Sequence, residues 1–197
     1  MVLLRTKKTS RIFCRGPIRV IGGDFKGRRL LSPRWNGLRP TSDRLRGTLF
    51  NVLNNRIKDA VFLDGFSGTG AIGIEAISRG AATVVFIERD PRATALIEEN
   101  LDRCSVTKQG TVVHGSFPEI LDEDHEINGF DVVVLDPPYE CAESGIGAIL
   151  SAVAARVLSG GCVVLERPRK SRTANVEALN HQRRITSGRS VLDFYGK

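Results

Sequence analysis

Several residue patterns are missing from this chain of 197 residues, and each absence excludes a class of protein. The four cysteines lie far apart with no C-x-x-C pair, so neither a disulfide framework nor a zinc site is expected. No apolar run is long enough to cross a membrane, so no membrane partner is expected. The cysteine usage fits a reducing compartment, and we predict a cytoplasmic protein without a metal.

Acidic residues are absent from the first 23 positions, and charge is unevenly distributed along the whole chain. Residues 1–60 hold 15 Lys and Arg against 3 Asp and Glu, residues 61–164 hold 6 against 16, and residues 165–197 hold 8 against 3. An acidic middle between basic ends predicts a small-molecule site in the centre and a polyanion bound from the sides. Nucleic acid is the favoured polyanion, and a merely solubilised surface is the alternative.

The sequence beyond residue 60 alternates between strand and helix patterns. Continuous Val, Ile and Leu runs separated by amphipathic stretches predict a doubly wound α/β fold with a mostly parallel sheet. The expected strands are 61–66, 83–88, 111–115, 130–136 and 160–166, and the expected helices are 70–79, 91–103, 116–122 and 143–156. The C-terminal RRITSGRSVLDFYGK predicts an antiparallel hairpin around Ser187 and Gly188 at the sheet edge.

A smaller extension precedes this sheet. Residues 19–33 predict a short β-hairpin, and residues 42–58 predict a helix. Arg44 and Arg46 are expected on the helix face opposite its apolar stripe. Residues 1–17 are interpreted as a flexible basic arm, with an organelle targeting segment as the alternative.

Residues 62–73 read FLDGFSGTGAIG and contain a G-x-G-x-x-G pattern at Gly68, Gly70 and Gly73. Glycines at a strand-to-helix turn let the backbone approach a nucleotide closely. Asp64 comes just before them, and its carboxylate would repel the diphosphate of a dinucleotide. It suits the ammonium of an amino acid, which S-adenosylmethionine carries without any phosphate. A purely packing role is the alternative, and it applies best to Gly73.

Two further residues are expected at strand ends beside the same ligand. Glu88 ends the second predicted strand, where an acid can accept hydrogen bonds from both ribose hydroxyls. NAD and S-adenosylmethionine both carry a ribose, so Glu88 does not discriminate between them, and a solvated acid is the alternative. Ser116 follows the third strand, where the adenine would lie, and its hydroxyl could reach the ring amino group.

The fourth predicted strand ends in Asp136-Pro137-Pro138-Tyr139. The two prolines fix the backbone and remove two N–H donors, which leaves carbonyl oxygens as acceptors. Asp136 adds a side-chain acceptor, and Tyr139 offers a flat face on which a base can stack. Such a group of acceptors can hold an exocyclic amine and favour a more nucleophilic nitrogen. A rigid turn with a buried tyrosine is the alternative.

Taken together, these motifs resemble a known family. Residues 136–139 look like the (D/N)-P-P-(Y/F) motif of S-adenosylmethionine-dependent amino-methyltransferases, which act on DNA adenine, RNA guanine N2 or protein glutamine. RPTSDRLRGTLFNVL (39–53), preceded by RVIGGDFKGRRL (19–30), resembles the N-terminal signature of the bacterial 16S rRNA guanine-N2 methyltransferases that modify guanine 966. With the glycine motif and FIERD, the resemblance spans about residues 18–197.

The resemblance implies a Rossmann-like class I methyltransferase with S-adenosylmethionine as cofactor and 16S rRNA, within a small-subunit particle, as partner of a monomer. It implies an RNA-binding hairpin and helix at 18–58 and a methyltransferase domain at 59–197. The expected cofactor-binding residues are Asp64, Gly65, Ser67, Gly68, Gly70, Glu88 and Ser116. The residues expected to hold the target guanine are Asp136, Pro137, Pro138 and Tyr139. The expected RNA contacts are Lys26, Arg28, Arg29, Arg39, Thr41, Arg44 and Arg46. Two positions depart from the family pattern: Gly47 replaces a glutamate and Ser116 replaces an aspartate.

Three alternatives stay open. A DNA adenine-N6 or other nucleic-acid amino-methyltransferase would need target-recognition machinery, for which the extension before residue 59 leaves little room. An NAD-dependent oxidoreductase is disfavoured by Asp64 and by the lack of a catalytic setting for the histidines. An RNA-binding module without catalysis predicts loss of the acceptors at 136–139, which are intact.

Overall fold

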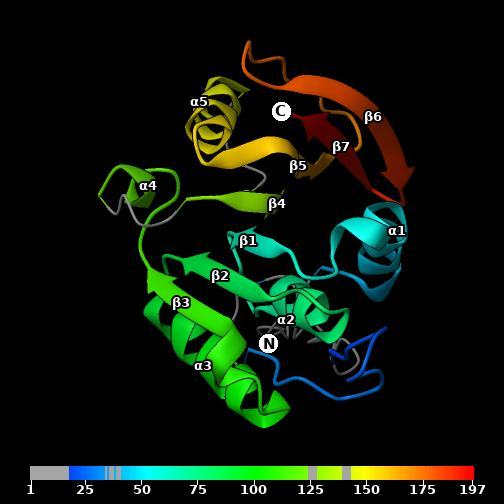
Figure 1. Ribbon diagram of the computed structural model, residues 1–197, viewed down its shortest axis with the longest axis vertical. Coiled ribbons are helices and arrows are strands. Elements are labelled where there is room, and N and C mark those ends of the chain that lie inside the picture. Colours follow the sequence, from blue (N-terminus) through cyan, green and yellow to red (C-terminus); the bar gives the residue numbers. More distant parts are fainter. Residues whose placement is uncertain (1–17, 34, 36–37, 39–40, 124–127, 139–142) are drawn as a thin grey trace, which may run out of the picture.

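The computed structural model describes residues 18–33, 35, 38, 41–123, 128–138 and 143–197 (Figure 1). Within this part of the chain, the strands form one sheet in the order β3-β2-β1-β4-β5-β7-β6. The predicted arm at 1–17, Arg39 and Tyr139 lie outside the described residues.

The first five strands are parallel neighbours, and β7 pairs antiparallel with both β5 and β6. The strands are β1 Val61–Gly65, β2 Thr83–Glu88, β3 Gly110–His114, β4 Phe130–Leu135, β5 Val157–Pro168, β6 Asn180–Ser187 and β7 Ser190–Gly196. The helices are α1 Asp43–Leu53, α2 Ala71–Ser78, α3 Pro91–Cys104, α4 Ile120–Glu123 and α5 Glu143–Ala154, with short 3-10 turns η1 Asn54–Arg56 and η2 Thr107–Gln109. The predicted mostly parallel α/β sheet with a C-terminal antiparallel hairpin is confirmed.

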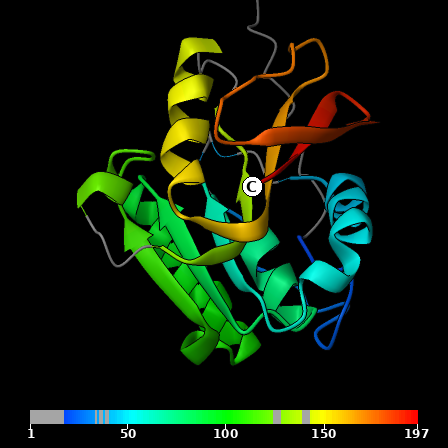
Figure 2. The ribbon, with the colours of Figure 1, turned by 45° about the horizontal axis from the view of Figure 1, so that its top comes forward.

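Helices cover both faces of the sheet, as Figure 2 shows from a tilted direction. Alternation along each strand sends successive apolar side chains to opposite faces. On β1, Phe62 packs in the core under α1, α2 and α3, whereas Leu63 packs in a second core under α4 and α5. Val132 and Val133 of β4 divide in the same way. The sheet therefore separates two hydrophobic cores.

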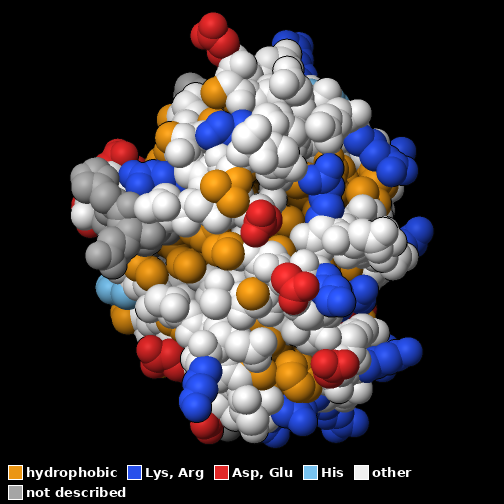
Figure 3. All heavy atoms as spheres, viewed as in Figure 1, with side chains coloured by type: hydrophobic (Ala, Val, Ile, Leu, Met, Phe, Trp, Pro, Cys, Tyr) orange, Lys and Arg blue, Asp and Glu red, His pale blue; other side chains and the backbone are white. Residues whose placement is uncertain are grey.

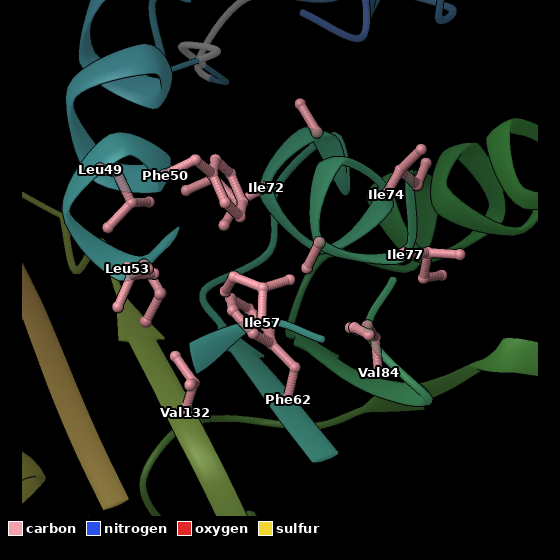
Figure 4. Close-up of a cluster of buried hydrophobic side chains, with 14 of the residues drawn as sticks. Leu49, Phe50, Leu53, Ile57, Phe62, Ile72, Ile74, Ile77, Val84 and Val132 are labelled. Carbon is pink, nitrogen blue, oxygen red and sulfur yellow. The ribbon is translucent and has the colours of Figure 1, made fainter. Parts of the chain in front are cut away.

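The N-terminal extension shares the larger core. Leu49, Phe50 and Leu53 of α1 lie in one buried cluster with Phe62 of β1 and Ile72 of α2 (Figure 4). Because this cluster spans the predicted boundary near residue 58, the extension is docked on the sheet by apolar packing. That the extension forms an RNA-binding unit stays a prediction.

The clearest departures from the predicted elements concern two helices and the N-terminal hairpin. The helix expected at 42–58 ends at Leu53, because Asn54 has φ 28° and leaves the helical region. The hairpin expected at 19–33 has one antiparallel bridge, between Arg19 and Arg29, and backbone hydrogen bonds from Val20 N to Arg28 O and from Leu30 N to Ile18 O. The helix expected at 116–122 begins only at Ile120. Pro118 disfavours helical backbone at Phe117, and residues 117–119 form turns before the helix.

None of the helices described is both long and apolar enough to cross a bilayer.

Gly47 offers a direct test of α1. A Cβ built there would meet only Ile21 Cδ1, at 3.7 Å, so the site has room for a side chain. Because glycine costs conformational entropy within a helix, Gly47→Ala should raise the free energy of unfolding by about 0.5–1 kcal/mol. Urea denaturation measures this change.

Gly73→Ala is the matched control, because a Cβ at Gly73 would lie 2.2 Å from Phe86 Cε1 and must destabilise the protein. A loss of stability in Gly47→Ala would contradict the fold of α1 described above.

Candidate functional site

Three carboxylates meet at the carboxyl edge of the sheet. Asp64 lies near the end of β1, Glu88 ends β2, and Asp136 follows β4. Parallel register sets these ends side by side, since Gly65 pairs with both Ile87 and Leu135. Asp64 and Glu88 are buried, and Asp136 is half-buried. The carboxyl edge beside strands β1 and β4 is where ligands bind in open α/β sheets.

The glycine loop is fixed by two of these carboxylates. Asp64 Oδ2 accepts the Gly73 N–H at 2.9 Å, in the first turn of α2. Glu88 Oε2 accepts the Gly68 N–H at 2.9 Å, and its Oε1 accepts the Asp90 N–H at 2.9 Å. Gly68 and Gly70 have φ of 56° and 72°, a conformation that favours glycine. Both acids are thus oriented by backbone donors.

The electrostatics of this edge favour a cation. Burial raises the pKa of the Asp64 carboxyl well above its ordinary value of 3.8. The Gly73 N–H opposes that shift, and the charges of Asp136 and Glu88 add to it. A positively charged ligand group would relieve the repulsion among the three carboxylates, whereas a diphosphate would increase it.

The remaining predicted cofactor residues take different positions. Gly65 has no room for a side chain, because a Cβ would lie 2.7 Å from Leu135 Cδ2. Ser67 Oγ lies 2.5 Å from the Asp64 carbonyl and donates to the backbone, so its hydroxyl holds the loop on the sheet. Ser116 is exposed after β3, and its carbonyl accepts the Ile120 N–H at 2.9 Å. Each of these three assignments stays a prediction.

The acceptor segment adjoins the glycine loop. The Asp136 N–H donates to the Gly65 carbonyl at 3.4 Å, Pro137 is buried and Pro138 is exposed. Thr41 Oγ1, from the segment before α1, donates to Asp136 Oδ2 at 3.0 Å. The N-terminal extension therefore reaches the predicted catalytic carboxylate.

One predicted RNA contact is wrong. The Arg46 side chain is 0% exposed, so it cannot face RNA. Its Nη2 donates to the Arg19 carbonyl and to Asp43 Oδ1, each at 2.7 Å, and its Nη1 lies 3.6 Å from Glu75 Oε2. Sequence pattern missed this because a buried, paired arginine and an exposed one look alike within a helix.

The other predicted RNA contacts divide into two groups. Arg44, Lys26 and Arg29 are exposed and stay predictions. Arg28 is exposed, but its Nη1 donates to the Cys104 carbonyl at 2.9 Å, at the end of α3. A cation at that position complements the negative end of the helix.

Two aromatic residues at the site were not predicted. Phe66, in the glycine loop, packs against Phe117, which follows β3, with ring centroids 5.0 Å apart. A Cβ on Gly65 would lie 3.3 Å from Phe117 Cε2, so the pair lines the turn. No motif points to Phe117, because only the β2–β3 register brings it to this edge.

Comparisons with known proteins place the chain in a family. Residues 18–196 match the family described as conserved hypothetical protein 95. The chain belongs to this family. It is 40% identical, over 135 residues, to the ribosomal RNA small subunit methyltransferase D of Haemophilus influenzae, covering 68% of this chain and 69% of that protein.

Solved structures of relatives share the fold. A protein of Escherichia coli described as a putative methyltransferase is 32% identical with a TM-score of 0.78, covering 92% of this chain and 98% of its own. An RNA methyltransferase of Salinibacter ruber, in complex with S-adenosyl-L-homocysteine, is 19% identical with a TM-score of 0.62, covering 80% and 93%. The class I methyltransferase fold predicted from the sequence is confirmed.

The raised pKa of Asp64 predicts how stability depends on pH. The folded state holds a proton on this carboxyl at pH values where the unfolded state has lost it, so ionisation of Asp64 lowers stability as pH rises above about 3.8. Asp64→Asn removes this titration. The free energy of unfolding of the unmodified protein, minus that of the variant, should therefore fall between pH 4 and pH 7 in the absence of ligand.

Urea denaturation across this pH range measures the difference, with Asp24→Asn, an exposed aspartate, as control. A difference that rises with pH would show that the fold favours the Asp64 carboxylate and would contradict the electrostatics described here.

Proposed function

We propose that this protein transfers a methyl group from S-adenosyl-L-methionine to the exocyclic N2 amine of guanine 966 in 16S rRNA. Membership of the family and the similarity to ribosomal RNA small subunit methyltransferase D support methylation of small-subunit rRNA. The observation that carries the proposal is the position of Asp136-Pro137, which adjoins the glycine loop of β1 through the hydrogen bond from Asp136 N to Gly65 O.

The residues at the carboxyl edge fit the cofactor. When bound, S-adenosylmethionine supplies a methyl group on a positively charged sulfur. Asp64 would face its ammonium and Glu88 its ribose hydroxyls, and both carboxylates are already oriented by N–H groups of the glycine loop. Gly65 and Gly68 would let the backbone approach the ligand, and the Phe66–Phe117 pair would border the adenine. The crowded carboxylates disfavour NAD, whose diphosphate is negative.

Asp136 and the Pro137 carbonyl would accept the two N–H bonds of the guanine amine. Hydrogen bonds from both N–H groups would reduce delocalisation of the nitrogen lone pair into the ring. They would also fix the orientation of the amine, which favours a more nucleophilic nitrogen. Thr41 holds Asp136 Oδ2 at 3.0 Å and so would set the direction of the carboxylate. Tyr139 would stack on the base.

An amine within a base stack is inaccessible, so the target guanine would be unstacked, within a loop of the RNA or an assembled small subunit. We infer that the protein acts as a monomer in the cytoplasm, with residues 18–58 contributing RNA contacts. Lys26, Arg29, Arg39 and Arg44 would supply these contacts.

Tritiated methyl transfer tests the proposal. Small ribosomal subunits and 16S rRNA from cells that lack the enzyme, and duplex DNA with unmodified adenine, are offered in parallel. Label should enter 16S rRNA and not DNA, and Asp136→Ala should lower kcat by about 10²–10³-fold while it leaves cofactor affinity nearly unchanged. Labelling of DNA alone, or full activity of Asp136→Ala, would contradict the proposal.

Thr41 gives a finer test of how Asp136 is oriented. Thr41→Val removes the hydroxyl but keeps the shape, and we expect kcat to fall about fivefold, because one net hydrogen bond is worth about 1 kcal/mol. The KM for RNA should change little, and Thr41→Ser should restore kcat. A Thr41→Val variant with raised KM and normal kcat would show that Thr41 binds RNA instead of orienting Asp136.

A further inference from the structure

Four exposed cations lie outside the segments predicted to bind RNA. Residues 167–172 read RPRKSR, without an acid, and run from the last two residues of β5 into the loop that follows. The turn between β6 and β7 adds another arginine. We call these exposed side chains the carboxyl-edge cluster: Arg169, Lys170, Arg172 and Arg189.

Strand register places this cluster beside the candidate site. Leu135 of β4 pairs with Leu165 of β5, and Pro168 of β5 pairs with Ser190 of β7. Asp136 and the cluster therefore lie at the same edge of the sheet, within two strand spacings, or roughly 10 Å across the sheet. Figure 3 shows Lys and Arg side chains gathered over the end of β6 and beside α1.

The backbone of the cluster is held by hydrogen bonds. Arg169 N donates to the Arg189 carbonyl at 2.8 Å, which joins the loop after β5 to the β6–β7 turn. Arg167 Nη1 donates to the Arg172 carbonyl at 3.1 Å, and Arg184 Nη1 donates to the Ser171 carbonyl at 3.0 Å. Two other arginines thus fix the loop that presents the cluster, which lowers the ordering cost of binding.

The cluster side chains themselves are unpaired. Throughout the described part of the chain, none of the four forms an ion pair. By contrast, Asp193 holds Arg184 at 2.7 Å, and Arg46 lies beside Glu75. Free, exposed and pre-positioned positive charge at one edge suits a row of phosphates.

The RNA contacts predicted in the N-terminal hairpin lie at the opposite edge of the sheet. Phe25 N donates to Ser78 Oγ at the end of α2, and Arg28 reaches the end of α3. Helices in this fold run antiparallel to the parallel strands, so these helix ends lie at the amino edge of the sheet. The tip of the hairpin is therefore far from Asp136, and the carboxyl-edge cluster is nearer.

We propose that the carboxyl-edge cluster binds phosphates of the substrate RNA next to the target guanine. This inference rests on the proposed function for the identity of the RNA. Together with Arg44 in the first turn of α1, the cluster would border the site with positive charge while its centre stays acidic for the cofactor.

The test is a pair of matched double variants. Arg169→Gln with Arg189→Gln removes two cluster charges, and Arg103→Gln with Lys108→Gln removes two exposed charges that precede β3 at the amino edge. Binding of 16S rRNA is measured against salt concentration, with thermal melting as a check of folding. Each lost phosphate contact lowers the salt slope by about 0.7–0.9, so the cluster variant should lose about 1.4–1.8.

The amino-edge variant should keep both its slope and its kcat at saturating RNA. Equal slopes for the two double variants, or an unchanged slope in the cluster variant, would overturn the inference. Methyl transfer by the unmodified protein is scored separately. Its absence would defeat the proposed function without changing the slope comparison, and normal transfer with unchanged slopes would defeat only the cluster.

Discussion

The buried contact between Arg46 of α1 and Glu75 of α2 is the constraint on which the site depends. Both side chains are fully buried, with Arg46 Nη1 3.6 Å from Glu75 Oε2. Glu75 also accepts the Ile21 N–H at 2.7 Å and pairs with Arg79 at 2.8 Å, so one carboxylate joins the hairpin, α1 and α2. Removing one partner of such a buried pair leaves an uncompensated charge, which costs about 3–5 kcal/mol. While the pair is intact, the extension stays docked on the sheet and Thr41 can reach Asp136.

The site that results is built from carboxylates with different tasks. Asp64 and Glu88 are fixed by glycine-loop N–H groups, and we propose that they face the cationic cofactor. Asp136 is held by Thr41 and follows a neighbouring parallel strand. The cofactor and the RNA require opposite potentials at neighbouring places. An acidic centre bordered by exposed cations meets both requirements.

Local patterns predicted the sheet, its order of elements and the glycine loop, because strand runs and glycine turns are set by nearby residues. The same patterns failed where long-range contacts decide. The sequence pattern indicates a surface cation at Arg46, yet its buried side chain contacts Glu75 and the Arg19 carbonyl. Phe117 has no motif and reaches the site only through strand register, and the segment that orients Asp136 lies 95 residues away in the sequence.

The central claim is that Asp136 and Pro137 present acceptors to the N2 amine of guanine. Nucleoside mass spectrometry of the 16S rRNA fragment that contains guanine 966, isolated after methylation by the purified protein, tests it most directly, because it identifies the modified atom at that position. The account predicts N2-methylguanosine at guanine 966, formed by the unmodified protein and not by Asp136→Ala. Methylation of a ring nitrogen, of adenine or of a ribose hydroxyl would contradict it.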